Sequence, residues 1–106
     1  MSALSKKLRS IEGGYIGFWC TGCDGIHVIG VDNTDGKPKW SWDRNIDAPT
    51  FTPSILVTGG GNDKSRCHSF VCAGQIEYLK DCTHSLAGKT APITDWPYAE
   101  GEYGGV

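Results

Sequence analysis

The sequence predicts a mainly β fold: a small zinc-stabilised antiparallel β domain with a zinc-ribbon-like knuckle, hairpins and little helix. The chain has 106 residues, including 15 glycines and four tryptophans, and this composition without long helical patterns is typical of β proteins. Its five cysteines and three histidines gather in two stretches, residues 18–27 and 66–84. A metal held between these stretches would stabilise a core that is small at this length.

The length indicates one folded domain. We expect a flexible N-terminal arm over residues 1–13, a single zinc-binding β domain over 14–96 and a flexible tail over 97–106. No apolar run has the length of a signal peptide or a membrane span, so we expect no membrane partner and a cytoplasmic location. The formal net charge of −2 argues against a broad phosphate-binding surface, and nucleic acid is therefore not an expected partner.

The first hairpin is predicted from a strand over residues 15–19 and a partner strand over 27–31. Between them, CTGCDG (20–25) has the composition of a tight turn. Such a turn holds two thiols close together and leaves backbone N–H groups free to bond to the sulfurs.

The middle of the chain is predicted to hold two further strands. Residues 39–43 alternate polar and apolar, so Trp40 and Trp42 share one face. Residues 50–59 read as a strand that Pro53 interrupts, which predicts an edge position or a bulge there because proline cannot donate a ladder hydrogen bond.

A second hairpin is predicted around a two-residue turn at Ala73-Gly74. Side chains alternate across a strand, so Cys67 shares a face with Ser69 and Val71, while Cys72 lies on the other face and is expected to be free. The turn sets the register: Cys72 opposite Gln75, Val71 opposite Ile76, Phe70 opposite Glu77, Ser69 opposite Tyr78, His68 opposite Leu79, and Cys67 opposite Lys80.

The cysteine spacing predicts a Zn²⁺ site, because tetrahedral sulfur-rich sites in a reducing cell favour zinc. We expect Cys20 and Cys23 to bind together with two of Cys67, Cys82 and His84. If the second strand continues, Cys82 becomes a diagonal neighbour of Cys67. The spacing is compatible with two choices for these two ligands: Cys67 with Cys82, or Cys82 with His84.

Two other interpretations of the cysteines remain. They can be buried small hydrophobic residues, or Cys20 and Cys23 can form a redox pair. A redox pair requires a helix directly after the motif, whereas residues 24–28 read as a turn that leads into a strand.

His27, His68, Trp40 and Trp42 are candidate ligand-binding residues. The two tryptophans with a shared face could form a stacking platform, although core packing is the more common role of such residues. His68 is expected to face away from the metal. Asp81 is expected to cap a turn through its side chain.

Several motifs together resemble a family of small phage and prophage proteins of unknown function, some of which carry the label ammonia monooxygenase. The resemblance spans residues 15–95. It rests on these stretches: WCTGC (19–23), His27, WSWD (40–43), PTFTPSIL (49–56), RCHSF (66–70) and GQIEYLKDCTHSLAG (74–88). It implies a metal cluster and a phage setting.

Two functional hypotheses follow. The first is a zinc-binding phage-type module that binds or inhibits a host protein or binds a small ligand in the host cytoplasm. The second is a metal-dependent hydrolase that acts on a nucleotide or an amide, with a histidine-rich open metal site and an acid as base.

Overall fold

The computed structural model describes residues 1–58, 65–99 and 102, and every regular element in these residues is a β-strand. The strands are β1 (Ser2–Ala3), β2 (Leu8–Ile11), β3 (Tyr15–Cys20), β4 (Gly25–Gly30), β5 (Ser41–Trp42), β6 (Phe51–Thr58), β7 (Arg66–Cys72), β8 (Gln75–Tyr78) and β9 (Thr90–Pro92). The mainly β prediction is confirmed. A helix long and apolar enough to cross a membrane is absent from the described part of the chain.

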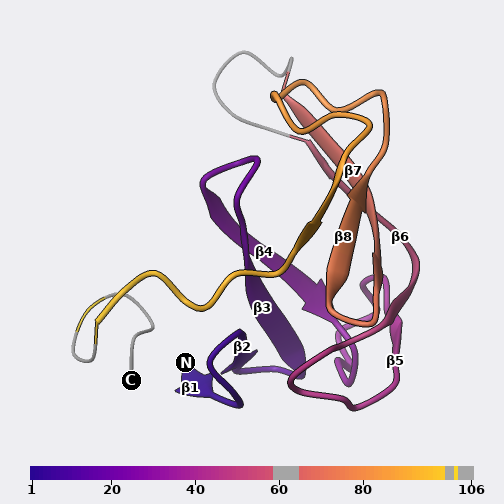
Figure 1. Cartoon of the computed structure of the whole chain (residues 1–106). Coiled ribbons are helices and arrows are strands. Elements are labelled where there is room, and N and C mark those ends of the chain that lie inside the picture. Colours follow the sequence, from indigo (N-terminus) through magenta and orange to yellow (C-terminus); the bar gives the residue numbers. More distant parts are fainter. Residues whose placement is uncertain (59–64, 100–101, 103–106) are drawn as a thin grey trace.

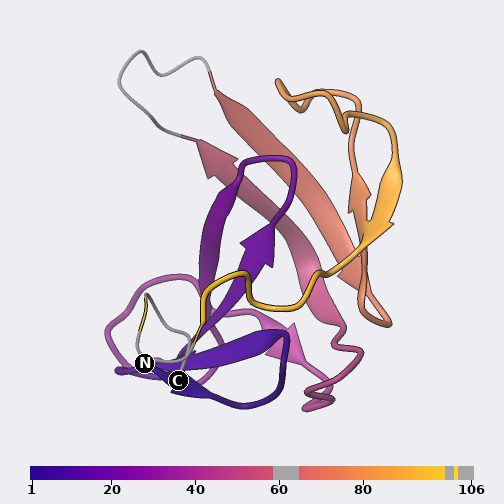
Figure 2. The same ribbon diagram turned by 60° about the vertical axis from the view of Figure 1, so that its left-hand side comes forward.

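The strands form two antiparallel sheets (Figure 1). One sheet has the order β1-β2-β3-β4 and the other the order β5-β6-β7-β8-β9. In Figure 2 the β3–β4 hairpin lies against the larger sheet, and buried side chains from both sheets meet in one core. Phe18 of β3 stacks on Phe51 of β6 with ring centroids 6.1 Å apart. Burial of large side chains such as these is the main stabilising term for a domain of this size.

The N-terminal segment differs from the flexible arm expected over residues 1–13, because β1 and β2 both lie in it. Leu8 pairs with Phe18 of β3 and is fully buried, and the guanidinium of Arg9 lies 4.8 Å from the centre of the Trp96 ring. These contacts link positions distant in sequence, so the local pattern does not show them. Residues 100–101 and 103–106 of the expected tail lie outside the described residues.

The first hairpin forms as predicted, but with other bounds. β3 is one residue longer than expected and includes Cys20, while β4 begins two residues earlier and ends one residue earlier than expected. The predicted irregularity at Pro53 is also confirmed, since the register of β6 against β7 shifts between Phe51 and Ile55. This shift allows the strand to accommodate a residue without an N–H donor. It also decides which residues of β7 lie opposite the end of β6, where Ile55 pairs with Ser69 and Leu56 with His68.

The second hairpin has the predicted turn. Ala73 and Gly74 both have positive φ angles, 49° and 76°, as a type I′ turn requires. The predicted pairs from Cys72–Gln75 to Ser69–Tyr78 are all present.

The predicted ladder does not extend to Lys80, however. The N–H of Cys82 donates to the carbonyl of Leu79 at 3.1 Å and closes a turn. As a result the N–H of Thr83 bonds to the carbonyl of Arg66 at 2.9 Å. In a continuous ladder, Asp81 would lie opposite Arg66 instead.

Candidate functional sites: a metal centre and a Ser–His–Asp triad

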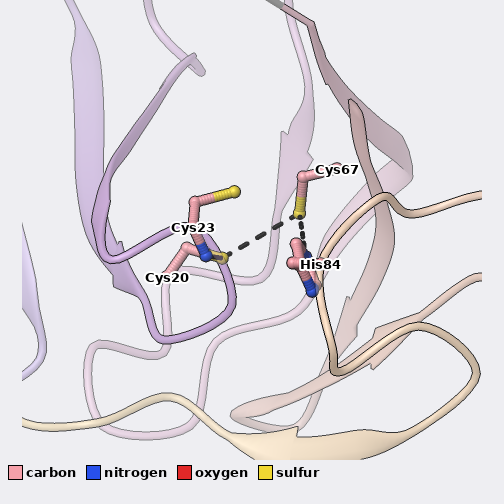
Figure 3. A group of neighbouring side chains, drawn as sticks. All are labelled: Cys20, Cys23, Cys67 and His84. Carbon is pink, nitrogen blue, oxygen red and sulfur yellow. Dashed lines mark hydrogen bonds between the residues drawn. The ribbon is translucent and has the colours of Figure 1, made fainter. Parts of the chain in front are cut away.

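Three cysteines and one histidine converge between the two sheets (Figure 3). Cys20 and Cys23 come from the β3–β4 hairpin, Cys67 from β7 and His84 from the loop after β8. One ligand atom from each lies within 4.8 Å of all the others. Three sulfurs and one imidazole nitrogen match the Cys₃His donor set of closed tetrahedral zinc sites, so these side chains fit a metal ion.

The side chains of this group contact one another directly. The Sγ atoms of Cys20 and Cys67 lie 3.9 Å apart, and Nε2 of His84 lies 3.3 Å from Sγ of Cys67. The N–H of Cys23 donates to Sγ of Cys20 at 3.4 Å, which is the N–H···S bond expected of a zinc knuckle. Cys20 and Cys67 are buried, whereas Cys23 is exposed.

The three thiols of this group differ in the direction in which their pKa values are shifted. The hydrogen bond with Cys67 lowers the pKa of Cys20, and the nearby His27 ring acts in the same direction. The same bond raises the pKa of Cys67, and burial raises the pKa of Cys23. The group by itself therefore favours one thiolate with neighbouring thiols. A divalent cation would stabilise further thiolates, because the thiolate is the form that binds metal.

Cys82 lies outside this group of four. Its Sγ accepts a hydrogen bond from the backbone N–H of His68 and lies 3.2 Å from the carbonyl oxygen of the same residue. The turn that closes at Cys82 directs its side chain to the edge of β7 and brings His84 to Cys67 instead. Cys72 is exposed at the second hairpin, on the face that strand alternation predicted.

Gly22 packs directly against the imidazole of His84. A Cβ atom at this position would lie 2.6 Å from both ring nitrogens, which is shorter than real Cβ contacts allow. We therefore expect Gly22→Ala to displace His84 and to weaken zinc binding by about 10- to 100-fold, as loss of a supporting contact does in other zinc sites. Competition with a chelating dye measures this affinity. Gly25→Ala is the matched control, since Gly25 lies in the same hairpin and has room for a Cβ. Equal zinc affinities for the two variants would contradict the assignment of His84.

A second constellation lies on the other face of β7. Nε2 of His68 lies 3.1 Å from Oγ of Ser54 on β6, and Nδ1 of His68 lies 3.2 Å from Oδ2 of Asp81 in the turn after β8. Hydroxyl, imidazole and carboxylate thus form one hydrogen-bonded chain. This is the geometry in which a serine is activated as a nucleophile.

Each member of this triad is held by its surroundings. The indole N–H of Trp40 donates to the carbonyl of Ser54 at 3.2 Å. Cys82 bonds to both backbone groups of His68, and a guanidinium nitrogen of Arg66 lies 3.7 Å from Oδ2 of Asp81. The imidazole side chain is 27% exposed, so a substrate can approach it from solvent.

The four residues expected to bind a ligand do not form one site. His68 belongs to the triad and Trp40 supports its serine. His27 is 3% exposed and packs edge-on against Phe18, and its ring nitrogens have no hydrogen-bond partner among the described residues. Trp42 packs against Phe51. A stacking platform made of the two tryptophans remains a prediction.

Sequence reasoning missed Ser54 and assigned Asp81 to a turn cap. A usable signal was the alternation along β7, since His68 points outward between the buried residues Cys67 and Ser69. Its partners could not be chosen from the sequence, because the bulge at Pro53 and the turn at residues 79–82 each shift the register of the segment that follows.

Comparison with protein families gives a match over most of the chain. The family model described as "BubE: Bacterial ubiquitination-like system serine protease" matches residues 3–79. The matched region contains Ser54 and His68 but ends before Asp81. Comparisons with curated proteins and with solved structures give no match. The phage setting that the resemblance implied remains a prediction.

Proposed function

Because this chain belongs to the BubE family of serine proteases from bacterial ubiquitination-like systems, we propose that it is a serine peptidase with Ser54, His68 and Asp81 as its catalytic triad. The observation that carries this proposal is the hydrogen-bonded chain from Ser54 through His68 to Asp81. The family description supports the reaction class, and the geometry supports the choice of residues.

The chemistry of each group follows from its place in the chain of hydrogen bonds. Oγ of Ser54 attacks the carbonyl carbon of the scissile bond, and Nε2 of His68 takes the hydroxyl proton. His68 then gives this proton to the leaving amine, and an acyl group remains on Ser54. Water, deprotonated by the same imidazole, releases the acyl group as a carboxylic acid. Asp81 accepts the Nδ1–H bond and so holds the tautomer that leaves Nε2 free to act as a base.

We propose that the four-residue group binds Zn²⁺ as a structural ion. Four protein ligands complete a tetrahedron and leave no position for a substrate or a water. The ion would cross-link the β3–β4 hairpin to β7 and to the loop after β8. A histidine-rich catalytic metal site has less support, because His68 lies on the other face of β7 from His84 and is hydrogen-bonded to Ser54 and Asp81.

The proposed substrate is a polypeptide of a bacterial ubiquitination-like system, as the family description suggests. This proposal keeps one part of the hydrolase hypothesis, the hydrolysis of an amide bond. It replaces the metal-dependent mechanism by attack of a serine hydroxyl. A binding or inhibitory role towards a host protein remains a prediction.

A fluorophosphonate probe, which reacts with activated serines, tests the proposal directly. We expect one probe adduct per chain, and peptide mapping by mass spectrometry should place it on Ser54. Ser54→Ala should abolish labelling, and His68→Ala should slow it strongly because the base is lost. Ser41→Ala is the matched control, since Ser41 is an exposed strand serine. An unlabelled native protein, or an adduct on another serine, would refute the assignment.

A further inference from the structure

Two large apolar side chains lie exposed beside the triad. Leu56 is 54% exposed and pairs directly with His68 across β6 and β7. Phe70 is 44% exposed and follows His68 by two residues on β7. Both therefore project from the outer face of the sheet, on the same side as the imidazole.

The arrangement on this face is a small square. Ser54 and Leu56 are alternate residues of β6, and His68 and Phe70 are alternate residues of β7. The hydrogen bond from Ser54 to His68 runs along one diagonal, and Leu56 and Phe70 occupy the other. A segment that places a carbonyl carbon on Oγ of Ser54 thus meets an apolar side chain on either side of that point.

Single exposed apolar residues are common and need no explanation. Leu56 and Phe70 differ because they adjoin a nucleophile, and an apolar surface next to reactive groups is typical of a ligand site. Val28, which is 46% exposed, shows the contrast, because it lies on β4 of the other sheet.

We infer that Leu56 and Phe70 form the substrate-binding surface of this peptidase and select an extended polypeptide segment with apolar side chains on both sides of the scissile bond. The inference rests on the proposed function. Burial of the substrate's apolar side chains against Leu56 and Phe70 contributes to the selection. The segment must be extended, since only an extended chain can follow the open face of a sheet with its side chains in alternation.

Two sets of internally quenched peptides test this inference. One set carries Leu or Phe at the two positions that flank the cleaved bond, and the other carries Ser or Gln there. For the native protein we expect kcat/KM to be about tenfold or more higher on the apolar set, as is usual for apolar specificity contacts. The measured quantity is the ratio of the two values for the same protein variant, so that a general loss of activity cancels.

Leu56→Ser and Phe70→Ser should each bring this ratio towards one. Val28→Ser is the matched control and should keep the native ratio, since it removes a similarly exposed apolar side chain from the sheet that does not carry the triad. A native ratio in both test variants, with Ser54→Ala inactive, would overturn the inference and leave the peptidase proposal intact. A native protein that cleaves neither peptide set and reacts with no fluorophosphonate would overturn both.

Discussion

Replacement of Ser54 by Ala is expected to lower kcat/KM for peptide cleavage by about 10⁴-fold or more, because no other group can form the acyl intermediate. His68→Ala should cost about as much. Asp81→Asn should also cost up to about 10⁴-fold, since an amide in place of the carboxylate favours the wrong imidazole tautomer. Steady-state kinetics on a quenched peptide measure all three values.

The double variant of Ser54 and His68 provides a stringent control. Triad members act as a unit, so removing both residues should cost hardly more than removing one. Circular dichroism should show unchanged sheet content in all the variants, because Ser54 and Asp81 are not part of the core. If Ser54→Ala retained activity that a chelator abolished, a metal-dependent hydrolase would replace the serine mechanism.

Removal of zinc is expected to unfold the protein. The apparent binding free energy of structural zinc in small domains is about 10–16 kcal/mol at neutral pH, and the whole stability of a domain is about 5–15 kcal/mol. A strong chelator should therefore abolish the cooperative thermal transition. The measurements are zinc content by elemental analysis and a thermal melt followed by circular dichroism, with zinc re-addition as the reversal.

When a chelator removes the zinc, peptidase activity should be lost as the protein unfolds. The turn and loop after β8 carry both Asp81 of the triad and His84 of the metal group, and Cys82 between them is hydrogen-bonded to the backbone of His68. Loss of the ion would free this segment and separate Asp81 from His68. Cys20→Ser should reproduce the effect of the chelator, whereas Cys72→Ser should not, because Cys72 is exposed and outside the metal group. A full thermal transition at zero zinc content would contradict a structural ion.

The local patterns were informative where a short segment sets its own geometry. The turn at Ala73-Gly74 requires only two residues with positive φ, and its register follows by alternation. The Cys20–Cys23 knuckle is likewise defined within four residues. The interruption at Pro53 follows from the missing N–H of proline alone. Each of these features depends on backbone chemistry that neighbouring residues largely determine.

The N-terminal strands could not be predicted in this way. Leu8 is buried by Phe18 and the rest of the core, and the backbone of Lys6 accepts a hydrogen bond from Trp96 near the other end of the described chain. Such contacts cannot be read from the local sequence, which here is a short polar segment with few apolar residues.

The sequence by itself determined a small β domain, its two hairpins, and the meeting of an early pair of cysteines with a later cluster of cysteine and histidine. Only the tertiary structure decided that His84 and not Cys82 joins that group, and that Ser54 and Asp81 lie on either side of His68. The physical reason is the same for both. A bulge at Pro53 and a turn closed by Cys82 change which side chains face one another. The proline marks where the first irregularity falls, but the size of both register shifts is set by pairing and packing between strands.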